Sequence, residues 1–149
     1  MNPLSKVNKQ LLEDFSLAVL KEREAISEVI SYLSYIWARK LYAEAGYSSL
    51  FHFLVEKYHY SEGAAYRRIQ GAKVYQKFPE ILELLKNGKL NLMTLSLIEP
   101  HLNQKNGSSL INRVLNKSKR EVEEILSELS LKKEKIQDVI RRLPLKREF

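Results

Sequence analysis

A long stretch without glycine or proline, from Leu11 to Leu41, most constrains what this chain can fold into. Apolar residues in its second half recur at steps of three and four, which is the spacing of one face of an amphipathic helix. The charged run Lys21–Glu24 is expected to separate a short first helix from a longer second one, which Gly46 would end. The apolar residues of the predicted face are Ile26, Val29, Ile30, Leu33, Ile36, Trp37 and Leu41.

The rest of the chain is rich in residues that begin and end helices. Ser, Asn and Pro favour helix N-termini because they cap or dispense with free backbone N–H groups, and Gly favours C-termini. The expected helices are one capped by Ser48 or Ser49 and running to about Tyr58, one from Ser61 to about Phe78, Glu80–Asn87 after Pro79 and before Gly88, and Leu92–Glu99 between Asn91 and Pro100.

The C-terminal third continues the helical pattern. Asn106-Gly107-Ser108 is typical of a turn, and Ser118-x-x-Glu121 is typical of a capping box, which predicts a helix over Val122–Leu129. A last helix is expected over Lys132–Leu143, ended by Pro144. The chain is therefore predicted to be all-α: a single compact domain of about six to eight helices over residues 1–144, with a frayed basic tail at 145–149.

Charge and composition suggest a class of partner. The chain has 149 residues, enough for one domain with a core, and a formal net charge of +7. An excess of Lys and Arg favours a polyanionic partner, because each neutralised phosphate releases condensed counterions. Plain solubility is the alternative explanation of the same charge.

Several function classes find no support in the sequence. Cysteine is absent, which excludes disulfides and thiolate metal ligands, and the three histidines lack the spacing of a helical metal site. No glycine-rich phosphate loop or nucleophile elbow occurs. We therefore expect no catalytic residues, no metal and no cofactor. Without a signal peptide or an apolar run long enough for a bilayer, a cytoplasmic chain with no membrane partner is expected, associated with the nucleoid if it binds DNA.

The region Gly46–Lys77 predicts a helix-turn-helix. A short helix, a three-residue turn at His59–Ser61 and a longer helix of about 61–76 are the parts of that motif. Small residues such as Ala64, Ala65 and Ala72 would allow the two helices to cross closely. The same outline also occurs in ordinary helix bundles, where paired arginines are usually a solvated face.

The predicted recognition helix supplies the candidate DNA-binding residues. Arg67, Arg68, Gln70 and Lys73 are expected on its outer side, because Arg pairs with guanine and Gln with adenine in the major groove. Backbone N–H groups near Ser61 would meet a phosphate. Weaker phosphate candidates are Arg39, Lys40, Lys119 and Arg120.

Several longer motifs, in the same order, resemble the N-terminal helical region of a family of bacterial HNH endonucleases. The resemblance covers roughly Leu12 to Pro144 and implies a region that holds DNA for a nuclease domain located further along the chain. The catalytic histidines of that family lie in the nuclease domain, so activity does not carry over. The motifs are Arg39-Lys40-Leu41-Tyr42-x-x-x-Gly46-Tyr47-Ser48-Ser49-Leu50-Phe51, Tyr60–Gln70 with Ala72, Phe78-Pro79, Gly88-Lys89-Leu90, Ser118–Glu123 and Ile140–Pro144.

The leading hypothesis is a non-catalytic protein that binds double-stranded DNA, with a regulatory or architectural role. One alternative is a protein-interaction or homodimerisation module that uses an apolar seam on the helix over Ile26–Leu41. Another is the DNA-holding subunit of a nuclease that acts in trans.

Overall fold

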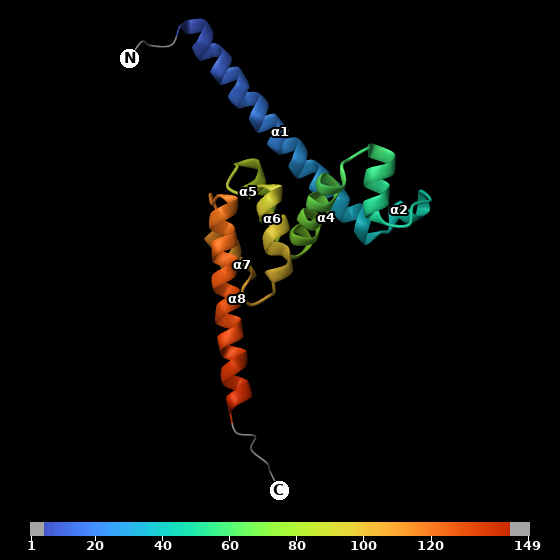
Figure 1. The fold of residues 1–149 in the computed structure, drawn as a ribbon. Helices are drawn as coiled ribbons and strands as arrows, with labels where there is room; N and C mark the ends of the chain where they lie inside the picture. The colour runs from blue at the N-terminus through green and yellow to red at the C-terminus, as the bar shows by residue number, and fades with distance from the viewer. Residues whose placement is uncertain (1–4, 144–149) are drawn as a thin grey trace.

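The computed structural model of the chain describes residues 5–143. Within these residues the backbone forms helices joined by short turns and no β-strand (Figure 1). The predicted all-α class and the predicted number of helices are confirmed. The elements in chain order are α1 (Lys6–Ala38), α2 (Leu41–Glu44), α3 (Leu50–His52), the π-helical turn η1 (Phe53–Lys57), α4 (Glu62–Lys77), α5 (Ile81–Lys86), α6 (Leu92–Ile98), the 3₁₀ turn η2 (Glu99–His101), α7 (Gly107–Val114) and α8 (Lys119–Arg142).

Helix α1 is continuous over 33 residues, so the predicted break at Lys21–Glu24 is wrong. Lys, Glu and Arg are good helix formers and stay exposed here, so a charged run without Gly or Pro gives the helix no reason to end. The helix ends at Ala38, earlier than predicted, and Lys40 reverses the chain with a left-handed φ of 53°. Gly46, with φ 91°, follows the C-cap of the short α2.

Helix α8 is also continuous, over 24 residues, so the two predicted helices Val122–Leu129 and Lys132–Leu143 are one. The residues between them, Ser130 and Leu131, are exposed and contain no helix breaker. The predicted capping box is confirmed. The Oγ of Ser118 accepts from the Glu121 N–H, and the Glu121 carboxylate accepts from the Ser118 N–H, both at 3.2 Å.

Local capping sets most of the other helix starts. The side chains of Ser49, Ser61 and Asn91 each accept a hydrogen bond from the backbone N–H three residues ahead, as the sequence predicted. The short helix of α3 and η1 closes before His59, whose φ of 60° turns the chain toward α4. The Tyr60 N–H donates to the Leu54 carbonyl at 3.3 Å across this turn.

Helix α4 is the centre of the domain, packed between α1 and α6. Gly71 lies between these helices, against the side chains of Ile30 and Leu92. One apolar cluster fills the space among α1, α4, α5, α6, α7 and α8. A second, smaller cluster lies among α1, α3, η1 and α4; its buried members are Leu33, Leu50, Phe53, Leu54, Ala65 and Ala72.

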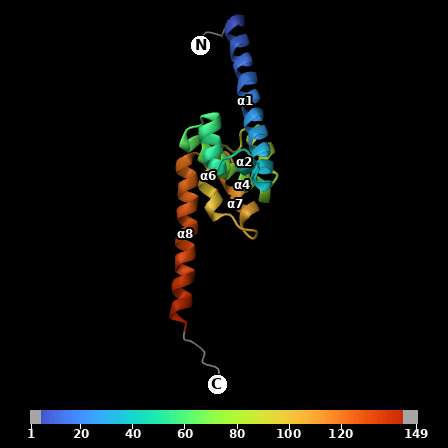
Figure 2. The same ribbon diagram turned by 90° about the vertical axis from the view of Figure 1, so that its right-hand side faces the viewer.

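The outer parts of α1 and α8 extend beyond this packed region at opposite ends of the molecule (Figures 1 and 2). The compact part of the domain therefore excludes the first half of α1 and the second half of α8. Both extensions carry large exposed apolar side chains, which are Val7, Leu11, Leu12, Phe15, Leu17 and Leu20 on α1, Leu131, Ile136, Val139 and Ile140 on α8, and its C-cap residue Leu143. The apolar seam predicted over Ile26–Leu41 is instead largely used inside the chain, where Ile30 and Leu33 are buried. The predicted tail at 145–149 lies outside the described residues.

Candidate nucleic-acid interface

The predicted short helix, turn and longer helix occur in that order, as α3 with η1, the turn through Ser61, and α4. Helix α4 does not project from the domain along its length, because α1 and α6 cover it on two sides. Its first turns are open, where Ser61, Glu62, Gly63 and Tyr66 are exposed, and so is its C-terminal end at Gln76 and Lys77. Any contact between α4 and a nucleic acid is therefore confined to its two ends and to the flanks that α1 and α6 leave uncovered.

The predicted outer face of α4 is not one face. At about 100° per residue, Arg67, Arg68, Gln70 and Lys73 spread over about 220° of the helix circumference. Gln70 is only 7% exposed, and its Oε1 has no hydrogen-bond partner among the described residues. The prediction that Gln70 faces a groove and reads adenine is wrong, because this position packs inside the domain.

Arg68 is held by an aromatic ring and a carbonyl oxygen. Its guanidinium carbon lies 4.7 Å from the centroid of the Tyr60 ring, and its Nη1 donates to the Ala64 carbonyl at 3.1 Å. Arg67 lies over Gly63, with Nη1 3.2 Å from the position that a Cβ would take. Neither arginine has a carboxylate partner among residues 5–143, so both keep an uncompensated positive charge.

Cation–aromatic contacts recur through this half of the molecule. Lys73 Nζ lies 5.9 Å from the Trp37 ring, and Arg39 lies 5.5 Å from the Tyr35 ring. Lys57 Nζ lies near two adjacent rings, 5.6 Å from the centroid of Phe53 and 5.7 Å from that of Tyr58. A ring attracts a cation through its quadrupole without neutralising it, so the charge stays available to an external anion. We call Arg39, Lys57, Arg68 and Lys73 the cation–aromatic group.

The cations of the C-terminal third are arranged differently. Lys119 pairs with Glu123 at 3.9 Å and Arg120 pairs with Glu124 at 3.4 Å, one helical turn apart on α8. Two neighbouring cations, Lys117 and Arg113, also have carboxylate partners. Carboxylates therefore offset the charge of Lys119 and Arg120, the two predicted phosphate candidates of α8. Lys40 is exposed at the reversal between α1 and α2, far in the sequence from the ion pairs of Lys119 and Arg120.

Two members of the cation–aromatic group, Lys57 and Arg68, contact aromatic rings that line an apolar groove of about 290 Å³ between α1 and η1. Tyr32 and Tyr58 stand exposed at this groove, and the half-buried Tyr60 carries Arg68 on its ring. Tyr32 lies one turn before Ile36 on α1 and therefore shares this side of the helix, a relationship that the spacing in the sequence could have revealed. The groove is lined by Val29, Tyr32, Leu33, Ile36, Phe53, Leu54, Tyr58 and Tyr60.

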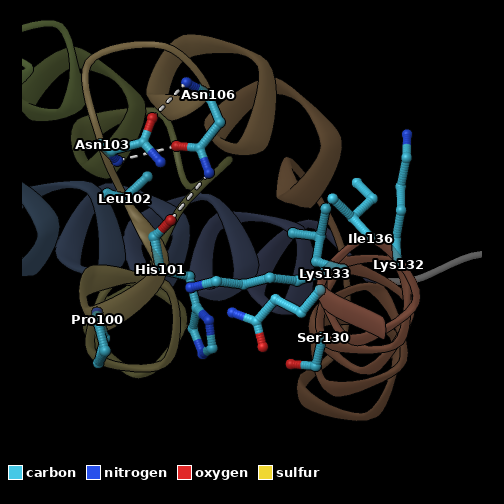
Figure 3. A pocket seen from close by; sticks show the side chains of 11 residues that line it. Pro100, His101, Leu102, Asn103, Asn106, Ser130, Lys132, Lys133 and Ile136 are labelled. Carbon is cyan, nitrogen blue, oxygen red and sulfur yellow. Dashed lines mark hydrogen bonds between the residues drawn. The ribbon is translucent and has the colours of Figure 1, made fainter. Parts of the chain in front are cut away.

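A larger cleft, of about 610 Å³, separates the 100–106 loop from α8 (Figure 3). The asparagines of its loop bond within the loop: Asn103 and Asn106 exchange hydrogen bonds between backbone and side chain, and Asn106 Nδ2 donates to the His101 carbonyl at 3.0 Å. Lys132 and Lys133 line the α8 side of the cleft. These asparagines therefore shape the loop.

No group of three or more His, Asp or Glu side chains with metal-site geometry occurs in residues 5–143. His52 Nδ1 lies 2.7 Å from the Ser48 Oγ and 3.0 Å from the Ser49 Oγ at the exposed start of α3. No carboxylate among these residues bonds to that imidazole, as a catalytic triad would require.

The helices within residues 5–143 include none long and apolar enough to cross a membrane. Comparison of the chain with protein-family models, with curated proteins and with solved structures finds no match.

Proposed function

We propose that this chain binds double-stranded DNA without catalysing a reaction, through phosphate contacts made by the cation–aromatic group. The proposal rests on one observation within residues 5–143: the cations that contact aromatic rings and the cations that pair with carboxylates lie in different parts of the chain. All five cation–π contacts lie between Tyr35 and Lys73, and all four ion pairs lie between Arg113 and Glu128.

This separation matters because phosphate binding depends on cations that have no competing anion. An ion-paired lysine must lose its carboxylate partner before it can neutralise a phosphate, whereas a lysine over a ring keeps its charge and loses some of its side-chain freedom. The rings also hold Arg68 and Lys73 near one orientation, which lowers the entropy lost when they contact the backbone of DNA.

The proposed phosphate contacts would determine the affinity of the protein for DNA and its orientation on the duplex. Phosphate contacts position a protein on the duplex, whereas base edges carry the sequence information. With Gln70 buried, no side chain at that position is available for adenine, and Arg67 is left as the guanine-reading candidate on α4. The resemblance to the N-terminal region of HNH endonucleases implies the same task of holding DNA, on its own or for a nuclease acting in trans.

Titration of a labelled duplex at several salt concentrations tests the proposal. Four phosphate contacts predict a slope of log K against log[salt] of about −3.6, since each contact contributes about −0.9. The test variant is Lys57→Ala/Arg68→Ala/Lys73→Ala, and the matched control is Arg113→Ala/Lys119→Ala/Arg120→Ala, which removes the same charge from ion-paired positions.

The test variant should lose most of the salt dependence while its helical circular dichroism stays unchanged, and the control should bind like the wild type. Equal losses in both variants would show that only net charge matters and would refute the assigned surface. A wild-type chain that ignores duplex DNA at low salt would refute the function itself.

A further inference from the structure

The cleft between the 100–106 loop and α8 is lined by cationic, polar and apolar side chains and by no carboxylate (Figure 3). Its volume of about 610 Å³ lies within the range of clefts that hold small organic ligands, about 300–1,000 Å³. The lining residues with a basic side chain are His101, Lys132 and Lys133. A cleft of this size and charge suits an organic anion.

Lys133 forms no ion pair with a carboxylate in residues 5–143. The sequence explains why it differs from the ion-paired cations at the start of α8. Lys119 and Arg120 each have a glutamate four residues ahead, one helical turn away. Lys133 instead has Gln137 four residues ahead and Leu129 four residues behind. The charge of Lys133 is therefore available to an external anion.

The carboxylates closest in sequence belong to other sides of the helix. At about 100° per residue, Glu134 lies about 100° around α8 from Lys133, and Asp138 and Glu128 lie about 140° from it. The loop 100–106 contains no Asp or Glu, and Glu99, which precedes it, does not line the cleft. The absence of acidic side chains from the cleft therefore reflects the register of α8 and the composition of the loop.

Hydrogen-bond donors face the cleft from both walls. In Figure 3 the Lys133 side chain extends from α8 toward the loop, on the side where His101 lies, whereas Lys132 points away from the loop. Ser130 and Gln137 lie about 60° and 40° around α8 from Lys133 and also line the cleft. An ammonium, an imidazole, a hydroxyl and an amide can all donate hydrogen bonds, and phosphate oxygens accept them.

The loop that carries His101 is ordered by its own hydrogen bonds. Asn106 Nδ2 donates to the His101 carbonyl at 3.0 Å, and the Asn106 N–H donates to Asn103 Oδ1 at 2.8 Å. The same Oδ1 accepts from the Lys105 N–H at 2.9 Å. A wall that is ordered before a ligand arrives loses little conformational entropy on binding.

The remainder of the cleft is apolar. Leu102 and Leu129 are half-buried in its walls, and Ile136 is exposed at its edge. A phosphate ion alone would leave these side chains and most of the space in water. A ligand that carries an apolar group beside its phosphate would cover both parts of the cleft.

We propose that this cleft binds a small phosphate ester that carries an apolar or aromatic group. The phosphate lies at Lys133 and His101. The organic group lies against Leu102, Leu129 and Ile136. A mononucleotide is one molecule of this class. The cleft shares no residue with the cation–aromatic group, so this inference does not rest on the proposed function.

Nuclear magnetic resonance titration of the full, isotope-labelled chain with phenyl phosphate tests the site. Phenyl phosphate joins the two parts of the ligand, and inorganic phosphate and phenol each supply one part. Phenyl phosphate should shift the signals of residues 100–106 and 130–137 with a dissociation constant of about 1 mM or below, an ordinary value for a ligand of this size. Each half probe should bind roughly tenfold or more weakly. Phenyl phosphate that shifts no signal of the cleft, or that binds no better than inorganic phosphate, overturns the proposal.

Charge removal tests which lysine binds the phosphate. Lys133→Gln should weaken the binding of phenyl phosphate roughly tenfold, because a charge-assisted hydrogen bond is lost. The matched control Lys135→Gln removes the same charge from an exposed position about 160° around α8 and should bind like the wild type. His101→Leu keeps an apolar side chain without a donor and should also weaken binding. Helical circular dichroism verifies that each variant is folded. Equal losses in Lys133→Gln and Lys135→Gln would show that only net charge matters and would overturn the site.

Competition with a DNA duplex distinguishes a small molecule from the DNA backbone as the source of the phosphate. A small ligand predicts that a saturating duplex leaves the phenyl phosphate shifts in place, and that Lys133→Gln keeps the wild-type slope of log K against log[salt]. Displacement by the duplex, with a slope smaller by about 0.9 in Lys133→Gln, would overturn the small ligand and assign the cleft to backbone phosphate. A chain that binds phenyl phosphate and ignores DNA would refute the proposed function alone.

Discussion

Gly71 of α4 faces Ile30 of α1 so closely that a Cβ on Gly71 would lie 3.0 Å from the Ile30 Cδ1 atom. The same Cβ would lie 3.3 Å from the Leu92 Cδ2 of α6. The three helices that meet here form the centre of the domain, and the absence of a side chain at position 71 allows them to pack.

Replacement of Gly71 by Val should therefore destabilise the domain by about 1–3 kcal/mol, the usual cost of extra volume in a packed core. Gly63→Val in the same helix is the control, because its Cβ would meet only the end of the flexible Arg67 side chain. Urea denaturation should show little change for the control. Equal stability of the two variants would contradict the close approach.

Replacement of Gln70 should stabilise the domain, whereas replacement of Gly71 should destabilise it. A buried amide oxygen without a hydrogen-bond partner destabilises the folded state by about 1–3 kcal/mol. Gln70→Met keeps a similar shape without the polar group, so it should raise the free energy of unfolding by about 1 kcal/mol. It should leave DNA affinity unchanged, whereas a groove-facing glutamine would lose affinity on replacement.

The capping box of α8 predicts a dependence of stability on pH. Hydrogen bonds from the backbone and the hydroxyl of Ser118, together with the charge of Lys117, hold the pKa of Glu121 below its ordinary value of 4.5. A carboxyl with a lowered folded-state pKa stabilises the folded protein above its unfolded pKa, and this contribution is lost as the pH falls through the folded value.

The melting temperature of Glu121→Gln should therefore lie below that of the wild type at pH 7, and the gap should close in acid. Glutamine retains the reciprocal hydrogen bond of the box, so the variant isolates the effect of charge. A gap of the same size at both pH values would show that the charge of Glu121 does not contribute.

The contribution of the Tyr60 ring to DNA binding can be tested separately from that of the Arg68 charge. Tyr60→Leu removes the ring under the guanidinium and keeps every cation, so the slope of log K against log[salt] should stay at the wild-type value. The affinity itself should fall severalfold, because Arg68 loses the contact that orients it. A Tyr60→Phe control keeps the ring and should bind like the wild type. If Tyr60→Leu also lowered the slope, the ring would be needed to hold Arg68 at the phosphate.

The helix starts were predictable because capping is local. Ser49, Ser61, Asn91 and Ser118 each bond to a backbone N–H within three residues, and the residue type alone favours that geometry. The continuity of α1 and α8 was also encoded in the lack of Gly and Pro, because charged and polar residues do not by themselves end a helix.

The candidate interface was less predictable because α4 is covered on two sides. A surface helix shows one apolar stripe, which tells its inner from its outer face. In α4, Ala65 and Ala72 pack against one cluster while Val74 packs against the other, so no single stripe exists. The spread of Arg67, Arg68, Gln70 and Lys73 over about 220° of the helix was available from the sequence and shows that the four do not share one narrow face.

By itself the sequence determined that the chain is helical, where most helices begin, and that it carries an excess of positive charge. These properties depend on bonds between near neighbours and on composition. Tertiary structure alone decided that Gln70 is buried, that Arg68 meets Tyr60, and that the ends of α1 and α8 lie beyond the core. Such features depend on which helices cross and where, and a crossing joins residues far apart in the chain that no local pattern specifies.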